Sequence, residues 1–307
     1  MENKENSKKA IDHTKNKARN GKLGMSIHIG LNGVDPTHYQ GWDGKLTACE
    51  FDAKDMKAIA DSQNFNSKLL LTKNATHDAV IQSIEEAAQK LKQGDELIIT
   101  TSCHGGQMED ENGDEKDDHK DETWVLYDKE LVDDELYSLF GKFEQGVRIL
   151  ILSDSCHSGT VTRAADYKRL TSVTRDLLKD TGSGGETPMF RAIPEDIQEK
   201  TYEKNKDYYS NIQKTYPAGE RVAIGASVIL LSGCQDNQLS ADGPRNGLFT
   251  GTLRKVWNEG KFVGGYYKFF KEIGRQMPPY QSPNYFKIGV SDIHFERMKP
   301  FTLETAA

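Results

Sequence analysis

Short continuous apolar runs recur along this chain and alternate with stretches of helical periodicity. Residues 97–101, 147–152 and 226–231 are three such runs, and runs of this kind are typical of strands buried on both faces of a parallel sheet. Before the first of them, Val80, Ile84 and Leu91 follow helical spacing behind a predicted N-cap at Thr76. The alternation predicts an α/β fold, a three-layer sandwich with a mainly parallel central sheet and helices on both faces.

Composition narrows the class of protein. The 307 residues are enough for one large domain with a substantial core. A net charge of −7 argues against a nucleic-acid partner, and no apolar run approaches the length of a membrane span, so no membrane association is expected. Four cysteines without an export signal predict reduced thiols and a cytoplasmic location.

Two polar segments directly follow two of the apolar runs: residues 102–106 (SCHGG) and residues 154–159 (DSCHSG). Ligands of open α/β sheets bind beyond the carboxyl ends of the strands, so we expect His104 and Cys156 to face one cleft. An imidazole that takes a thiol proton creates a nucleophile and later protonates a leaving amine. We therefore assign Cys156 as nucleophile, His104 as general base and acid, and the N–H groups of Gly105 and Cys156 as an oxyanion hole.

These residues also have simpler interpretations. A single cysteine is more often a small buried apolar residue than a nucleophile, and a single histidine is more often structural. Zinc binding by Cys103, His104, Cys156 and His157 is disfavoured, because adjacent residues of an extended chain point to opposite faces and no metal-ligand spacing is present. By the same alternation, Cys103 should point away from the cleft if His104 faces it.

The two segments together resemble the metacaspases, in particular their bacterial relatives the orthocaspases, within the caspase–haemoglobinase fold. The resemblance runs from about residue 25 to about residue 290, and the segment around Cys156 is its more specific part. It implies a caspase-like sandwich and a cysteine endopeptidase that cleaves protein or peptide substrates after arginine or lysine. It also implies a monomer.

The resemblance further implies a pocket for the basic side chain of the substrate. Asp52 and Asp154 match its two acidic positions, Ser102 and Cys49 match lining positions, and Asp236 is a further candidate. The chemistry agrees, because a guanidinium in a recessed pocket needs carboxylates that it can pair with through two N–H groups. Without the resemblance, Asp52 is equally a helix-start residue, Asp154 a turn residue and Asp236 a cap.

An acidic stretch follows the histidine segment, with nine acidic residues among the fourteen from 109 to 122. Asp121, Asp133 and Asp134 match calcium-ligand positions of the resembled family, and carboxylate oxygens suit this cation. Where that family often has a further aspartate, this chain has Arg163. Calcium binding and a solvated acidic loop without metal both stay open. No organic cofactor is expected.

Four parts are expected along the chain: a disordered basic leader (1–24), a large catalytic part with the Cys–His dyad (25–162), a linker or insertion (163–222) and a small catalytic part of the same compact domain (223–307). The resemblance implies that the enzyme itself cuts the linker, and exposed loops are the usual sites of such cuts. The alternative function is an inactive caspase-like binding or regulatory module. That alternative gives no reason to keep His104, Cys156 and both pocket aspartates at strand ends.

Overall fold

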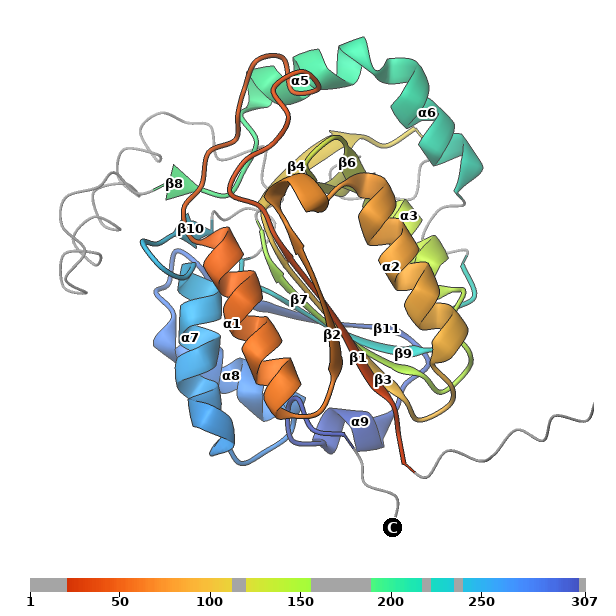
Figure 1. Ribbon diagram of the computed structural model, residues 1–307, viewed down its shortest axis with the longest axis vertical. Helices are drawn as coiled ribbons and strands as arrows, with labels where there is room; N and C mark the ends of the chain where they lie inside the picture. Colours follow the sequence, from red (N-terminus) through yellow and green to blue (C-terminus); the bar gives the residue numbers. More distant parts are fainter. Residues whose placement is uncertain (1–20, 112–119, 156–188, 217–221, 235–239, 304–307) are drawn as a thin grey trace, which may run out of the picture.

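A six-stranded sheet forms the centre of the molecule (Figure 1). The computed structural model describes residues 21–111, 120–155, 189–216, 222–234 and 240–303. The strand order is β11-β9-β7-β3-β1-β2, and every neighbouring pair is parallel except β11, which runs antiparallel to β9. The strands are β1 (Gly24–Gly30), β2 (Asn66–Leu71), β3 (Glu96–Ser102), β7 (Arg148–Asp154), β9 (Ser227–Ser232) and β11 (Asn284–Gly289). Every residue of β3 and β7 is buried, as their continuous apolar character predicts.

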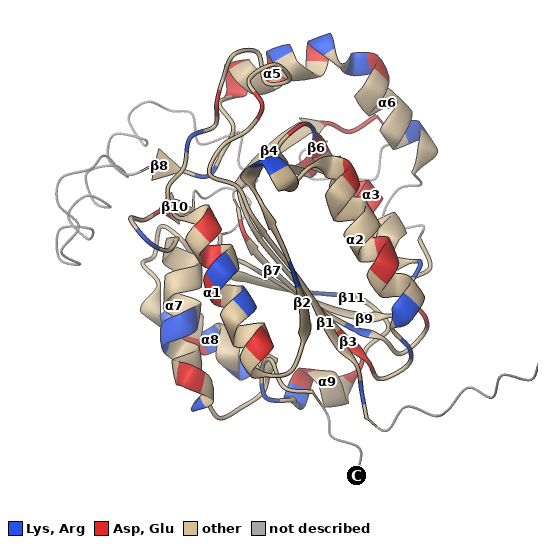
Figure 2. Cartoon of the chain, viewed as in Figure 1, with Lys and Arg blue, Asp and Glu red and all other residues tan. Residues whose placement is uncertain are grey.

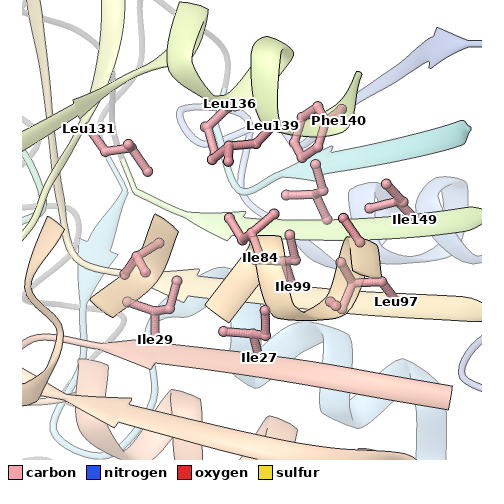
Figure 3. Packing of buried hydrophobic residues seen from close by; sticks show 14 of the residues in the cluster. Ile27, Ile29, Ile84, Leu97, Ile99, Leu131, Leu136, Leu139, Phe140 and Ile149 are labelled. Carbon is pink, nitrogen blue, oxygen red and sulfur yellow. The ribbon is translucent and has the colours of Figure 1, made fainter. Parts of the chain in front are cut away.

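Helices cover both faces of this sheet, which makes the three-layer sandwich (Figure 1). One face carries α2 (His77–Lys90) and α3 (Asp133–Phe140), and the other carries α1 (Cys49–Ser62), α7 (Leu248–Trp257) and α8 (Tyr266–Gln276). Figure 3 shows Ile27, Ile99 and Ile149 of three neighbouring strands packed against Ile84 of α2 and Phe140 of α3. The charged residues lie mainly on the outer faces of the helices and in the connections (Figure 2). The predicted fold class is therefore confirmed.

The first turns of the helices show why they begin where they do. The Thr76 side chain accepts a hydrogen bond from the Ala79 N–H, which is the predicted N-cap of α2. The short α9 (Ile293–Arg297) is capped in the same way by Asp292. Single 3₁₀ turns follow β2 at Thr72–Asn74 and α7 at Asn258–Gly260.

A second, antiparallel sheet stands beyond the carboxyl end of β3. It contains β4 (His104–Glu109), β5 (Lys120–Val125) and β6 (Glu130–Val132). The sequence predicts a glycine-rich turn after Ser102, whereas the structure starts a strand at His104 itself. The glycines allow this, because a Cβ on Gly106 would lie 2.2 Å from the Gln198 side chain.

Part of the predicted linker is folded onto this second sheet. Helices α5 (Glu195–Lys204) and α6 (Lys206–Thr215) lie beside it (Figure 1). Gln198 of α5 donates a hydrogen bond to Glu130, and Gln213 of α6 donates one to the Glu109 carbonyl. Before α5, the two-residue strand β8 (Met189–Phe190) pairs with β10 (Ala241–Asp242). These residues of the linker are therefore tied to both the large and the small part of the chain.

Parts of two predicted segments, the leader and the linker, are not among the described residues. Most of the predicted leader and residues 163–188 of the linker lie outside the described residues, so the four-part division stays a prediction. Within the described ranges, no helix combines the length and the apolar character needed to cross a bilayer.

Candidate active site

The candidate site lies at the carboxyl ends of the central strands. Strands β1, β3 and β7 end at Gly30, Ser102 and Asp154. These three residues are partners in the register of the sheet and lie side by side. His104 lies two residues beyond Ser102, and Cys156 follows two residues beyond Asp154 in the sequence. Cys156 itself is outside the described residues, so the structure gives no Cys–His distance.

Helix α1 brings Asp52 to this edge, although Asp52 is far from β3 and β7 in the sequence. The close approach depends on Gly30, because a Cβ at that position would lie 2.4 Å from the Cys49 carbonyl oxygen. Asp52 is buried, and its Oδ2 accepts a hydrogen bond of 2.8 Å from the Ser102 hydroxyl. The structure therefore brings together Asp52, Ser102 and Asp154, with Cys49 buried at the start of the same helix.

His104 is buried and held in one orientation. Its Nε2 donates a 3.0 Å hydrogen bond to the Gly44 carbonyl, and its ring lies 4.7 Å from the Trp42 ring. Burial lowers the pKa of His104 from 6.5 to about 4; the Gly44 and Ala192 backbone oppose this shift, and the charge of Arg191 adds to it. The imidazole is therefore neutral at pH 7.

The Gly44 contact also fixes the tautomer of His104. With the proton on Nε2, Nδ1 carries the lone pair, and it makes no well-formed hydrogen bond with any described residue. A buried imidazole nitrogen in this state is suited to accept a proton from a thiol. The sequence gives no sign of Gly44, because the contact uses its backbone.

The side chain of Arg191 fills the space between three buried carboxylates. The guanidinium of Arg191 is fully buried, and its Nη1 lies 3.0 Å from Asp154 Oδ1. Its Nη2 lies 2.7 Å from Asp52 Oδ2 and 2.9 Å from Asp242 Oδ1. We call Asp52, Asp154 and Asp242 the carboxylate pocket. Asp242 was not predicted, because no motif or periodicity distinguishes it.

The start of helix α7 completes the wall of the carboxylate pocket. A Cβ on Gly247 would lie 2.5 Å from Arg191 Nη2, so the glycine lies flat against the guanidinium. The Gly247 N–H donates to Asp52, and the Thr250 N–H and hydroxyl donate to Asp154. The carboxylates thus accept hydrogen bonds from a helix N-terminus, where negative charge is stabilised.

The carboxylate pocket holds more negative than positive charge. Burial raises the pKa of Asp52 to about 6; the Arg191 charge opposes this rise, and the nearby Asp154 charge adds to it. Conversely, burial disfavours the charged form of Arg191, but the surrounding Asp154, Cys49 and Asp52 raise its pKa above its ordinary value. A cation is therefore the species that this cavity suits electrostatically.

The main chain of Arg191 meets the predicted oxyanion hole. The Gly105 N–H donates a 2.9 Å hydrogen bond to the Arg191 carbonyl oxygen. An N–H that holds a carbonyl oxygen in this way is suited to stabilise the negative charge that develops there during acyl transfer. The second predicted donor, the Cys156 N–H, lies outside the described residues.

The caspase-domain family model matches residues 34–292. The chain belongs to the caspase-domain family. It is similar to metacaspase-1 of Candida glabrata, with 30% identity over 216 residues, and to metacaspase-1 of Schizosaccharomyces pombe, with 29% over 228. Those matches cover 64% and 68% of this chain. The chain spans about half the length of the curated relatives it matches, 51% of each of these two.

A solved structure has a similar fold over most of this chain. The crystal structure of protein GSU0716 from Geobacter sulfurreducens is 45% identical to this chain, with a TM-score of 0.79. The match covers 92% of this chain and 99% of that one. The caspase-domain match and the metacaspase relatives confirm the resemblance that the sequence predicts.

The other cysteines of this caspase-domain chain do not have the properties of nucleophiles. Cys49, Cys103 and Cys234 are free and buried. Burial raises the pKa of Cys103 to about 11 and that of Cys49 well above its usual value. Cys103 packs in the core beneath α2 and α3, away from the carboxylate pocket, as the alternation of side chains predicts. Thiols of this kind are inert at neutral pH.

The predicted calcium ligands lie at the second sheet. Asp121 is on β5, and Asp133 and Asp134 begin α3. Within the described ranges, no three acidic, histidine or cysteine side chains are grouped closely enough to hold a metal ion. The neighbouring residues 112–119, like the pocket candidate Asp236, are outside the described residues. The described residues alone do not fit a calcium site, and no step of the chemistry is assigned to the cation.

Proposed function

We propose that this chain is a cysteine endopeptidase that cleaves after arginine or lysine. The observation that carries the proposal is the guanidinium of Arg191, which lies among the three carboxylates of the pocket while its carbonyl oxygen accepts from Gly105. The buried, neutral His104 stands at the same strand ends. A substrate arginine bound in this way would present its carbonyl carbon for attack by Cys156.

The roles of the residues follow from acyl-transfer chemistry. His104 Nδ1 takes the Cys156 thiol proton, and the thiolate attacks the substrate carbonyl. The Gly105 N–H stabilises the oxyanion, and His104 returns the proton to the leaving amine. Water then hydrolyses the thioester. The fork of the guanidinium reaches three carboxylates at once, so we expect arginine to be preferred over lysine.

Calcium stimulation and a monomeric state are further predictions that follow from the resemblance. The experiment for calcium is a chelator titration that follows both activity and melting temperature. Unchanged values of both after removal of calcium would contradict a calcium requirement.

The decisive experiment compares short fluorogenic peptides that end in arginine, lysine or aspartate. We expect hydrolysis of the arginine peptide, weaker hydrolysis of the lysine peptide and none of the aspartate peptide. Cys156→Ala should lower the activity about 10³-fold or more. His104→Ala should lower it roughly 10²- to 10⁴-fold. Cys103→Ala is the matched control, because this buried cysteine lies in the core.

Two outcomes would contradict the proposal. Equal hydrolysis of the aspartate peptide would exclude the role of the carboxylate pocket. No hydrolysis by the folded wild-type chain and none by a folded Arg191→Gln variant, whose pocket is empty, would favour the inactive binding module.

A further inference from the structure

The guanidinium in the carboxylate pocket belongs to the chain itself. Arg191 is the largest fully buried side chain among the described residues, and it comes from the segment that connects the large and small parts. Burying a guanidinium is costly unless it is paired and fully hydrogen-bonded. Here Nη1 also donates to the Asp154 carbonyl at 2.9 Å, in addition to the ion pairs of the pocket.

The backbone around Arg191 is bound as an extended peptide on both sides. Upstream, β8 pairs antiparallel with β10, and the Arg191 N–H donates to the Ser240 carbonyl. Downstream, the Ile193 N–H donates to the Gly105 carbonyl, and Ala192 forms a parallel bridge with Gly105. Addition of an extended strand to existing backbone groups is a common mode of peptide recognition.

Neighbouring side chains reinforce this binding. Phe190 is buried against Cys234 and Ala241, and Ile193 is buried with Val34 and Tyr39. The segment is therefore anchored by side chains on either side of Arg191, in addition to the carboxylate pocket. A surface loop that merely passes the site would not need these contacts.

The reacting groups converge on one peptide bond. The Arg191 carbonyl oxygen is held by the Gly105 N–H, and the Ala192 backbone is close enough to His104 to affect its pKa. The bond between Arg191 and Ala192 thus has a basic residue in the carboxylate pocket, an oxyanion donor on its carbonyl and the general base beside it.

We propose that the uncut chain is self-inhibited by Arg191 and that its first substrate is its own Arg191–Ala192 bond. This inference rests on the proposed function. It adds the identity of the bond within the predicted linker, and the reason why the pocket is closed to other substrates until that bond is cut.

The step balances as a hydrolysis. The Cys156 thiolate forms a C–S bond to the Arg191 carbonyl carbon, and the C–N bond to Ala192 breaks as the amine takes a proton from His104. Water then adds its hydroxyl to the thioester carbon and gives its proton to His104, and the thiolate leaves. The products are a carboxylate at Arg191 and an amine at Ala192, and no oxidant or reductant is needed.

The test follows the wild-type chain by intact mass and by N-terminal sequencing, together with hydrolysis of the arginine peptide. We expect fragments 1–191 and 192–307, a new N-terminus at Ala192, and a rise of peptide hydrolysis that parallels the cut. Cys156→Ala should stay uncut. Lys200→Gln is the matched control, because this basic residue of the same segment pairs with Asp196 at the surface; it should be cut as the wild type is.

Two variants separate inhibition from cleavage. Arg191→Gln should not be cut at this bond and should hydrolyse the peptide without a lag. Ala192→Pro keeps Arg191 in the carboxylate pocket but replaces the scissile amide, so it should stay uncut and nearly inactive. Melting temperatures show whether both variants are folded. A third variant, Arg191→Lys, keeps a positive charge in the pocket and should still be cut.

The outcomes distinguish this inference from the proposed function. If Arg191→Gln hydrolyses the peptide while the wild type stays uncut at Arg191, or is cut only at other bonds, the inference is wrong and the proposed function stands. If wild type, Arg191→Gln and Arg191→Lys are all folded and inactive on the peptide and on themselves, both are wrong. Full activity of Ala192→Pro would overturn the self-inhibition.

Discussion

At the scale of single residues, the carboxylate pocket depends on a missing side chain as much as on its charges. Gly247 leaves the space into which the guanidinium fits, and its N–H also donates to Asp52. Its backbone dihedrals, φ −60° and ψ 156°, are open to any residue. Glycine is therefore needed here for close approach and not for its backbone freedom.

We predict that Gly247→Ala impairs cleavage after arginine more than cleavage after lysine. The new Cβ would lie 2.5–2.6 Å from guanidinium atoms. Overpacking of this kind typically costs about 1–3 kcal/mol, so kcat/KM for the arginine peptide should fall roughly 10- to 100-fold. Gly251→Ala is the control on the same helix, since its Cβ would meet Asn246 at an ordinary 3.5 Å. Equal losses in both variants would refute the close-packed wall.

The raised pKa of Asp52 predicts the acid limit of activity. Only the carboxylate form attracts a basic substrate, and the pKa of Asp52 is about 6 even with Arg191 in the pocket. In an empty pocket the Arg191 charge is gone, so the pKa of Asp52 moves further upward. The acid limb of kcat/KM, which reports the free enzyme, should therefore lie at pH 6 or above.

The measurement is a pair of pH profiles on the Arg191→Gln variant with the arginine peptide. The kcat profile reports the bound complex, so its acid limb should lie at lower pH than that of kcat/KM. His104 has a pKa of about 4 with Arg191 present; loss of that charge moves it upward too, and its limb should lie at the same pH in both profiles. A single limb shared by both profiles would contradict the role of Asp52, and Asp52→Asn should remove the limb that differs between them.

The sequence identifies the residues that carry a motif and misses those that act through backbone or space. Asp52, Asp154, Ser102 and Cys49 are predicted together, and the structure brings them together. Their roles in substrate binding stay predictions. Arg191 is one of several basic residues in a linker of mixed composition, and nothing local shows that its side chain is buried. That information lies in the pairing of β8 with β10, which joins residues about 50 apart and leaves no local pattern.

At the scale of elements, the carboxylate pocket is also a helix cap. Helix α7 has no side-chain cap of its own. Asp52 of α1 instead accepts from the N–H of the N-cap residue Gly247, and Asp154 of β7 accepts from the Thr250 N–H in the first turn. Elements from the two parts of the chain are thereby fixed to one another at the site. The sequence also misses β4: two glycines after His104 predict a turn, whereas the pairing with β5 and the close approach of Gln198 to Gly106 account for a strand there.

We predict that Asp154→Asn and Asp154→Ala differ in stability although both lose cleavage after arginine. In an Arg191→Gln background no guanidinium remains, so the difference reports the hydrogen bonds that Asp154 accepts from Thr250 and Ser240. The asparagine oxygen still accepts from the Thr250 N–H, whereas alanine leaves it without that acceptor. Loss of such a cap typically costs about 1 kcal/mol, so Asp154→Ala should have the lower melting temperature. Equal melting temperatures would show that the hydrogen bonds accepted by Asp154 do not stabilise the fold.

At the scale of the whole molecule, a cut after Arg191 divides the chain but not the sheet. Strand β9 of the later fragment pairs with β7 of the earlier one over Arg148–Ser153 and Ser227–Ser232. The core on the α1 side mixes both fragments, with Ile98 and Leu150 packed against Phe249. The alternation of strands and helices predicts this sandwich. It does not predict which strands are neighbours, because β9 joins β7 across the long linker.

The cut therefore changes the site without separating its parts. For Arg191 to withdraw from the pocket, the two-residue strand β8 has to leave β10, and Phe190 and the Arg191 N–H and guanidinium have to release their contacts. On the other side of the bond, α5 and α6 stay attached. Gln198 donates a hydrogen bond to Glu130. Both Tyr202 and Ser210 donate hydrogen bonds to Glu111. The new end at Ala192 then remains next to the site while the pocket opens.

We predict that the cut protein runs as one particle in size-exclusion chromatography and unfolds in one cooperative transition, although a denaturing gel separates two fragments. The shared sheet and core hold fragments 1–191 and 192–307 together, since separating them would expose β7, β9 and the apolar residues between them. The Cys156→Ala chain is the uncut reference and should elute at the same volume. Two separate peaks from the cut protein, or loss of peptide hydrolysis as it is diluted, would show that the linker, and not the sheet, joins the two parts.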